Sequence, residues 1–488
     1  MFPEMKMISE NDKRFYKLAQ KLDKITVKNS SNLLVLNNQL LHLTRNHPEY
    51  LDSWKPIIYS SSIAKVEYLR IVLRILRNFL YNVKLIYLEL FRNEKSNVGK
   101  SQFDNGVDLL IISHLVQEIS DDRDLYYGDL LAKLKELKVK FTRLLIPQSL
   151  DQNEISRSSR LDSIMLNSSL PNSVILKYMS LNLISVLRVI YFGVKFKLSL
   201  YEILVVVSGQ VNNFINYKLS SNIELAILRF KPNKLIMTFE GNAIERSVFS
   251  LCHKYEVESL GYQHAPVIKT QYSIFRSLGI KLDPDIVLSS GPYTKNLFLS
   301  NFDVPLKVKV LGSQKNVYAE VDLNNVLKFK SSKILLAPDG NIVSISNFIE
   351  LGIYLSTFLV DYQVIIRAHP LFDKFLKNMF AEMNIKKNFV FSVNSLESDL
   401  VEAKWVIYEN SSVSIQAGFY GCQLIYLGNN LSNVDPLFDL DVNKFTATSA
   451  NQVYQIVEKN RIANFENIRK AQSFCNDYFS PYNLNSIL

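Results

Sequence analysis

The chain has 488 residues, 48% of them hydrophobic, and a net charge of +10. A chain of this length and apolar content can bury more than one core, so we expect two domains. The cysteines, Cys252, Cys422 and Cys475, are too few and too scattered for a disulfide framework or a zinc cluster. The opening residues contain no apolar run typical of a secretory signal. We therefore expect a cytoplasmic protein.

The positive charge has three ordinary explanations: nucleic acid, an anionic membrane surface or an acidic substrate. The basic residues are dispersed and no RNA-binding or helix-turn-helix signature is present, which argues against nucleic acid. The longest apolar stretches, 57–91 and 174–207, are interrupted by Lys and Arg and lack the run of about twenty uncharged residues that a membrane span needs. We expect core helices there. The alternative is peripheral contact with anionic lipid at the inner face of the plasma membrane.

The first part of the chain contains six strand-like runs and two long helical patterns. Helices are expected at about 124–145 and 172–232, and the second of these predicts a helical insertion. The strands are expected at 32–38, 56–62, 107–116, 234–240, 257–264 and 285–290. Together they predict an α/β domain over residues 1–305.

The last part alternates strands with helix-length segments more regularly. Helical patterns at 343–360 and 371–383 separate runs rich in β-branched and aromatic residues. The expected strands are 306–312, 333–340, 361–370, 388–393, 404–412 and 423–430. This alternation predicts βαβ units and a second parallel-sheet domain over 306–488, whose final helix packs back on the first domain.

Two of these strands end in residues suited to an anion. The run IIRAHP ends at His369 and Pro370, and YENSSVS carries Ser411 and Ser412. The first N–H groups of a helix are unpaired and the helix dipole is positive there, so a strand–helix junction can bind a phosphate without a metal. His-Pro is also a common dipeptide: His47-Pro48 lies in a polar stretch with no strand before it. The strand context is what distinguishes His369.

The order GYQHA (261–265), DPDIVLSSG (283–291), VKVLGS (308–313), APDG (337–340), RAHP (367–370) and ENSS (409–412) resembles the GT-B glycosyltransferases of bacterial surface polysaccharides. Within them, it is similar to the sialyltransferase and Kdo-transferase groups, which use CMP-activated sugars. The resemblance covers about residues 230–440. It implies a GT-B fold of two Rossmann-like domains, transfer of a ulosonic acid such as Kdo or a sialic-type sugar from a CMP-sugar, and a glycan or glycolipid acceptor of capsule, O-antigen or lipooligosaccharide synthesis.

The same resemblance implies a nucleotide site in the second domain. It assigns His369 to the CMP phosphate, and Ser411 and Ser412 to the phosphate or the donor carboxylate. Arg367 is a cation for the same anions. The remaining residues implied at this site are Asp339, Gly340, Asn341, Pro370 and Glu409.

Sialyltransferases of this kind carry an acidic pair followed by Gly in the first domain, and the pair contains the catalytic base. This chain has a single acid at the corresponding place, in Phe239-Glu240-Gly241. Glycosyl transfer needs a carboxylate or imidazole near the acceptor hydroxyl. Glu240 is the first candidate; Glu245, one turn into the next helix, is the second, with acceptor binding or a pair with Arg246 as its alternatives. His264, at another strand end, is either a site residue or a buried structural histidine.

No metal or other cofactor is needed in this scheme, because one phosphate can be met by a histidine, two hydroxyls and a helix terminus. Asp283-Pro284-Asp285 matches a DxD metal motif, but the proline before a strand favours a turn. Two other functions remain open. One is a CDP-glycerol-type glycerophosphotransferase, which has a similar body, and the other is a non-catalytic scaffold of a polysaccharide assembly complex.

Overall fold

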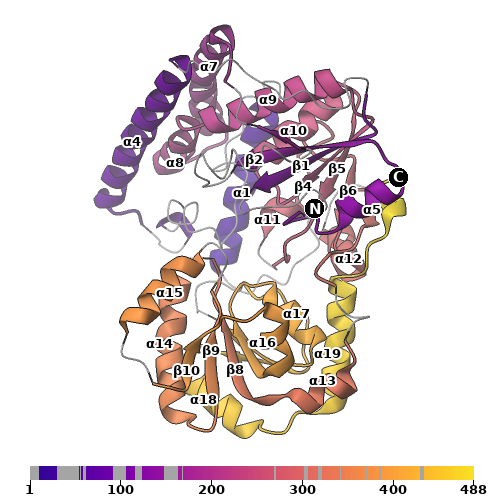
Figure 1. The fold of residues 1–488 in the computed structure, drawn as a ribbon. Helices are drawn as coiled ribbons and strands as arrows, with labels where there is room; N and C mark the ends of the chain where they lie inside the picture. The colour runs from indigo at the N-terminus through magenta and orange to yellow at the C-terminus, as the bar shows by residue number, and fades with distance from the viewer. Residues whose placement is uncertain are drawn as a thin grey trace.

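The computed structural model describes residues 10–29, 54, 56–58, 62–91, 106–115, 124–147, 163–166, 169–268, 271–301, 306–316, 321–340, 342–368, 372–383, 386–428 and 434–488. These residues form two lobes, each built on a parallel sheet with helices on both faces (Figure 1). The predicted fold class, two Rossmann-like domains in the GT-B arrangement, is confirmed.

The first sheet has seven strands in the order β3-β2-β1-β4-β5-β6-β7, and every neighbouring pair is parallel. The chain builds β1 to β3 toward one edge and then returns to place β4 on the other side of β1. This reversal is the topological switch point at which α/β sheets bind ligands. The strands are β1 (Leu109–Leu115), β2 (Phe141–Pro147), β3 (Ser163–Met165), β4 (Lys234–Thr238), β5 (Glu258–Tyr262), β6 (Ile286–Ser289) and β7 (Val308–Val310).

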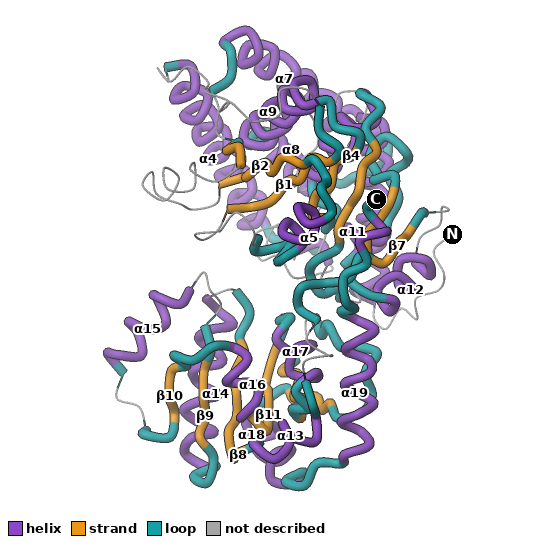
Figure 2. The backbone as a smooth tube through the Cα atoms, turned by 45° about the vertical axis from the view of Figure 1, so that its right-hand side comes forward, coloured by secondary structure: helices purple, strands orange, loops and turns teal. Residues whose placement is uncertain are grey.

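The second sheet repeats this plan with six parallel strands in the order β10-β9-β8-β11-β12-β13. Its switch point lies between β8 and β11. The strands are β8 (Ser331–Ala337), β9 (Gln363–Ile366), β10 (Phe389–Phe391), β11 (Ala403–Tyr408), β12 (Gln423–Leu427) and β13 (Lys444–Ala447). Figure 2 shows β8 to β11 running side by side through the lower lobe.

Both faces of each sheet are covered by helices. Alternate strand residues point to opposite sides, so each strand contributes to two cores. In the first sheet Leu110 and Met237 face one core, while Ile111 and Ile236 face the other. The covering helices of the two lobes are α5 (Leu130–Glu136), α10 (Ala243–Lys254), α11 (Tyr272–Phe275), α12 (Pro292–Asn301), α13 (Leu323–Phe329), α14 (Ile342–Phe358), α15 (Asp373–Glu382), α16 (Leu396–Glu402), α17 (Val413–Phe419), α18 (Ala450–Lys459) and α19 (Phe465–Tyr478).

A separate helical layer lies outside the first sheet and confirms the predicted insertion (Figure 1). Helix α8 contacts both α4 and α7, and α9 packs on α10. The layer has its own apolar cores, distinct from those of the sheet. Its helices are α1 (Glu10–Asn29), α4 (Lys65–Leu90), α7 (Asn172–Lys195), α8 (Leu200–Gln210) and α9 (Phe214–Phe230).

Several local predictions for the first lobe are wrong. Residues 124–145 were expected to be helical, but only Leu130–Glu136 is, and Phe141–Pro147 forms β2. The expected strand 56–62 is contradicted at Pro56, Ile57 and Ile58, which are helical. The expected strand 32–38 lies outside the described residues.

The first sheet also continues past the predicted domain boundary. Strand β7 pairs with β6, so residues 308–310 belong to the first sheet although the second domain was expected to start at 306. The short run VKVLG carries no local sign of which sheet it joins. The second sheet begins at β8.

The end of the chain returns to the first lobe. Helix α19 packs on α17 of the second lobe and on α12 of the first. Beyond it, Ser480 N–H donates to Ser290 O, Asn483 N–H donates to Leu311 O, and Ile487 joins a core of the first sheet. Helix α19 thus contacts both lobes, and the segment after it lies on the first.

The carboxyl edges of both sheets face the same interface between the lobes. Ile268, in the loop after β5, packs in the second-lobe core with Ala337 and Tyr408, the last residues of β8 and β11. Tyr293, at the start of α12 after β6, donates a hydrogen bond of 2.9 Å to Asp439, in the segment after β12. Ligand sites in α/β folds lie beyond the carboxyl ends of strands, so both edges that can bind ligands meet here.

Candidate functional site

The described site residues predicted from strand ends lie at or beside the two switch points. In the first sheet, Glu240 follows β4 and His264 follows the neighbouring strand β5. In the second sheet, Asp339 and Gly340 follow β8, while Ser411 and its neighbours follow β11. The site therefore has two parts, which we call the first edge and the second edge.

At the first edge, Glu240 is held in a tight turn. Oε2 of Glu245 accepts hydrogen bonds from the backbone N–H groups of Glu240, Gly241 and Asn242, at 2.9, 2.7 and 3.0 Å. Ser273 Oγ donates to Glu240 O at 2.8 Å. The backbone of Glu240 is thus fixed while its side chain stays 33% exposed.

Two features of the turn explain the residues next to Glu240. Gly241 has φ +81°, and a Cβ there would lie 2.1 Å from Ser273 O, so only glycine fits. Asn242 caps α10, with Glu245 as the reciprocal partner of a capping box. Glu245 is 1% exposed and its oxygen is shared by three N–H groups, which makes it a positioning residue for Glu240.

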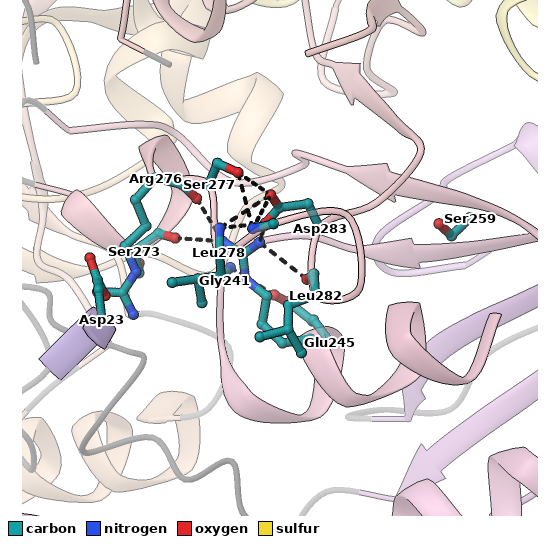
Figure 3. Close-up of polar contacts among 12 residues, drawn as sticks. Asp23, Gly241, Glu245, Ser259, Ser273, Arg276, Ser277, Leu278, Leu282 and Asp283 are labelled. Atoms are coloured by element: carbon teal, nitrogen blue, oxygen red, sulfur yellow. Dashed lines mark hydrogen bonds and ion pairs between the residues drawn. The ribbon is translucent and has the colours of Figure 1, made fainter. Parts of the chain in front are cut away.

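Arg246 does not pair with Glu245, as one interpretation of the sequence had it, but with Asp283. Asp283 also accepts from Ser277 Oγ and from the N–H groups of Leu278 and Gly279 (Figure 3). Asp285 is likewise engaged, accepting from Ser259 Oγ at 2.7 Å. Both carboxylates of the DxD-like segment serve the local fold, in agreement with the turn expected there.

His264 lies among aromatic and charged groups at the first edge. Its Nε2 is 3.9 Å from Glu240 Oε1, and its ring meets the Tyr126 ring edge-on at a centroid distance of 4.7 Å. Tyr126 in turn contacts His114 of β1 at 5.5 Å. The backbone N–H of Tyr126 donates a hydrogen bond of 2.8 Å to Asp124 Oδ1. This row of rings crosses the switch point from β1 to β5.

Burial shifts the acid–base behaviour of these groups in opposite directions. The pKa of Glu240 is raised by burial, and the positive charge of Lys315 opposes that rise. Burial, together with Lys315 and His114, lowers the pKa of His264 to about 3. Burial also lowers the pKa of Lys315 to about 8, against the influence of Glu240. At neutral pH His264 is therefore an uncharged neighbour, while Lys315 is largely cationic.

These shifts favour Glu240 as the base. A general base works best when its pKa lies near the working pH, and the pKa of Glu240 is displaced in that direction while that of His264 is displaced away from it. Glu245 also has a raised pKa, about 8, through burial and Glu240, but its oxygen is already used by the turn. Among the three predicted candidates, only Glu240 combines partial exposure with a suitable shift.

The second edge is organised around Ser344 in the first turn of α14. Ser344 Oγ accepts from Asp339 N–H at 3.2 Å, which ties the loop after β8 to the start of α14. Burial raises the pKa of Glu409, and a hydrogen bond to Ser344 opposes that shift. Gly340 is exposed beside them.

Ser411 and Ser412 lie half-buried between β11 and α17. Ser411 Oγ accepts from Val413 N–H at 3.3 Å, and Ser411 O accepts from Ser414 Oγ at 2.8 Å. Ser412 occupies the N-cap position of α17, but its hydroxyl makes no capping bond. The local hydrogen bonds thus shape the loop and leave the Ser412 hydroxyl outside the cap.

Arg367 is engaged in a structural contact. Its Nη1 donates to Asp399 and to Asn394 O, each at 2.8 Å, and Asp399 is buried. The carboxylate of Asp399 balances the guanidinium charge, so less of it is available to a ligand. The predicted role of Arg367 on the donor stays a prediction.

Asn341, His369 and Pro370 lie outside the described residues. Their assignment to the nucleotide continues to rest on the sequence. The described residues just before these positions, Gly340 and Ala368, follow β8 and β9, which are adjacent strands.

Sequence reasoning did not select Lys315, Tyr126, Ser344 or His114 as site residues. Lys315 follows β7 closely, so the strand-end rule that selected Glu240 would have selected its loop too. Ser344 and Tyr126 carry no such signal, since neither lies directly after a strand.

Within the described part of the chain, no group of three or more His, Cys, Asp or Glu side chains is arranged to hold a metal ion.

No family model and no curated protein sequence matches the chain. It is similar in structure to MurG of Acinetobacter baumannii, with 11% identity, a TM-score of 0.46, and coverage of 76% of this chain and 97% of that one. It is also similar to a UDP-GlcNAc 2-epimerase of Methanocaldococcus jannaschii in complex with UDP-GlcNAc and UDP, with 14% identity, a TM-score of 0.43, and coverage of 75% and 98%. A third similar structure is Anabaena Alr3699/HepE in complex with UDP, with 11% identity, a TM-score of 0.44, and coverage of 76% of this chain and 95% of that one. At these identities and scores the likenesses carry no conclusion about ligands or activity.

Proposed function

We propose that this protein is a glycosyltransferase of bacterial surface polysaccharide synthesis that moves a sugar from a nucleotide donor to a glycan or glycolipid. One observation supports this most strongly. The expected base, Glu240, and the expected phosphate residues, Ser411 and Ser412, follow strands at the switch points of two different sheets, and the carboxyl edges of those sheets meet at one interface.

In this proposal the second edge binds the donor. Ser411 and Ser412 hydrogen-bond the phosphate, and the first N–H groups after β11 add to that binding. His369 contributes from the end of β9, on the basis of the sequence alone. Glu409 accepts a hydrogen bond from a ribose hydroxyl, a role that suits a carboxylate near the switch point of a nucleotide-binding sheet.

The first edge performs the proton transfer. The acceptor hydroxyl oxygen attacks the anomeric carbon while Glu240 takes its proton, and the bond from that carbon to the nucleotide phosphate breaks with its electron pair going to the phosphate. Glu245 holds the turn that presents Glu240, and Lys315 favours the ionised carboxylate that can accept the proton. His264, uncharged, borders the same space.

We further propose that the donor is a CMP-activated ulosonic acid, as the sequence resemblance implies. Its single phosphate and sugar carboxylate suit two hydroxyls and a histidine, and no divalent ion is required in this scheme. Activity in the presence of EDTA is therefore expected.

The experiment offers CMP-Kdo, CMP-sialic acid, CDP-glycerol, UDP-hexoses and GDP-hexoses to the full-length protein with a glycan acceptor extract, and identifies products by mass spectrometry. Transfer from a CMP-sugar, lost in Glu240→Gln while CMP binding persists, supports the proposal. Transfer from UDP- or GDP-hexoses alone overturns the donor assignment.

Two other results would replace the proposal. Glycerol phosphate reaching the acceptor from CDP-glycerol would identify a glycerophosphotransferase. CMP binding without turnover of any donor would indicate a scaffold.

A further inference from the structure

Helix α4 presents a broad apolar face to solvent. Its buried side chains, Ile71, Asn82, Ile86 and Glu89, lie along one side of the helix. The opposite side carries large apolar residues that are each about half exposed, and the central ones are Leu69, Leu73, Leu76, Leu80, Val83 and Tyr87. These follow each other at spacings of three or four, so they form one stripe along a helix of 26 residues, or about 39 Å.

A row of basic residues runs beside this stripe. Arg70, Arg77 and Lys84 are spaced by seven, which places them almost in line on an α-helix, and all three are exposed. The helix has only two acidic residues: Glu67, which pairs with Arg70, and Glu89, which is buried and pairs with Lys218 at 2.6 Å. The outer face of α4 is therefore apolar with a positive border.

Helix α7 carries a second stripe of the same kind. Its exposed apolar residues are Leu176, Met179, Leu183, Leu187, Ile190 and Val194, again at spacings of three or four. The helix contains no acidic residue, and Lys177 and Lys195 are exposed at its two ends. Both α4 and α7 pack on α8, which is largely buried between them and the rest of the lobe (Figure 1).

By length and composition α7 is apolar enough to cross a membrane. Its contacts with the lobe indicate that it stays packed against the protein instead. Asn182 accepts a hydrogen bond from Gln210 of α8 at 3.1 Å, and Tyr178 bonds Asn82 of α4. Gly193 lies so close to Ile203 that a Cβ would approach a side-chain carbon to 2.8 Å. Spanning the bilayer would break these contacts and leave polar groups without partners.

We propose that the outer faces of α4 and α7 dock on an anionic membrane surface. The apolar stripes enter the boundary between headgroups and acyl chains, and Arg70, Arg77 and Lys84 contact lipid phosphates. A second copy of the chain fits less well, because a two-fold contact sets the same face against itself and the exposed charges on both helices are positive. The inference concerns exposed residues of α4 and α7 and none of the residues of the first and second edges, and its test needs no donor or acceptor.

The test is flotation of the full-length protein with vesicles of phosphatidylcholine alone, and with vesicles in which a third of that lipid is replaced by phosphatidylglycerol. We expect stronger binding to the anionic vesicles and weaker binding as salt is raised. Leu76→Glu with Leu80→Glu, and separately Leu183→Glu with Leu187→Glu, should weaken binding by roughly tenfold or more per leucine. The triple change Arg70→Gln, Arg77→Gln and Lys84→Gln should cost roughly fivefold per residue on anionic vesicles only.

The matched control is Val393→Glu with Ile462→Glu, which adds the same charge at apolar residues of the second lobe that are 82% and 92% exposed. It should bind vesicles like the unchanged protein, and thermal melting checks that all variants fold. Absence of flotation with anionic vesicles, or equal binding by the leucine variants and the control, overturns the proposal. So does a dimer, detected by light scattering, that dissociates in the leucine variants while vesicle binding is absent throughout.

Discussion

The first and second edges are built on the same strand order but differ in their chemistry. At the first edge, ionisable groups gather, and burial moves the pKa values of Glu240, His264 and Lys315 away from their ordinary values. At the second edge the described residues include the half-buried hydroxyls of Ser411 and Ser412 and the exposed Gly340, and burial raises the pKa of Glu409. The shared architecture thus positions both sites, and the residues added after each strand decide what each one does.

The difference indicates a division of labour. Shifted pKa values are typical of groups that exchange protons, while hydroxyls and helix-terminal N–H groups bind an anion without changing its protonation. Changes at the first edge should therefore alter turnover, and changes at the second should alter donor affinity.

The largest effect is expected from Glu240→Gln. Glutamine has nearly the same shape but cannot accept a proton, so turnover should fall by about 10²–10⁴-fold while CMP affinity stays unchanged. Initial rates and calorimetric titration with CMP measure the two quantities. The control is Glu258→Gln at the opposite end of the neighbouring strand, where the carboxylate lies 3.3 Å from Lys234. Full activity of Glu240→Gln would make His264 the next candidate.

The second prediction concerns Ser411→Ala combined with Ser412→Ala. A hydrogen bond to a charged group contributes about 1.5–3 kcal/mol, so losing even one should weaken CMP binding roughly tenfold to a hundredfold. Calorimetry with CMP gives the affinity. Ser346→Ala is the control, since that exposed serine donates to Ile342 O within its own helix. An unchanged affinity in the double variant would remove the second edge from the donor site.

Gly241→Ala should damage the first edge through its backbone. The new Cβ would meet Ser273 O at 2.1 Å, in a backbone conformation with φ +81° that alanine rarely adopts, so we expect a loss of about 1–3 kcal/mol in stability and reduced turnover. Gly279 has φ +92° with no atom near the Cβ position, so Gly279→Ala reports the backbone cost alone. Denaturant unfolding of both variants separates the clash from the conformation. Equal losses would mean that Ser273 moves aside easily.

The smallest effect is a shift of the pH profile in Lys315→Met. The positive charge of Lys315 lowers the pKa of Glu240, so its removal raises that pKa further above the ordinary value. Because a base acts only when ionised, the acidic limb of kcat/KM should move to higher pH. Lys307→Met, an exposed site at the other end of β7, serves as control. A limb that stays in place would show that the two charges are not coupled during turnover.

The sequence was most informative where a single local pattern determines the position. An apolar run followed by a polar residue marks the carboxyl end of a parallel strand, and that rule correctly placed Glu240 and His264 after neighbouring strands of the first sheet. It failed for Lys315 because residues 306–312 were given to the second domain. The sheet that a short strand joins depends on contacts with strands distant in sequence, which no local pattern records.

Strand β2 was missed for a related reason. Residues 142–146 are buried on both faces of the sheet, so they show no alternation of polar and apolar residues. The apolar part of this strand, residues 144–146, is too short to distinguish a strand from a buried helix. The row of rings from His114 to His264 was also beyond prediction, since it depends on Asp124 holding the backbone of Tyr126.

The return of the chain to the first lobe has a mechanical consequence. The polypeptide leaves the first sheet between β7 and β8 and comes back through α19, whose Tyr478 hydroxyl hydrogen-bonds both N–H and O of Val267. Lys234 then holds Ile487 O at 2.6 Å. Because two segments of the chain connect the lobes, the lobes cannot rotate freely about a single linker. A hinge motion between them is restricted to rotation about a line through both connections. Removing the last ten residues would therefore loosen the first lobe, although they follow the second in sequence.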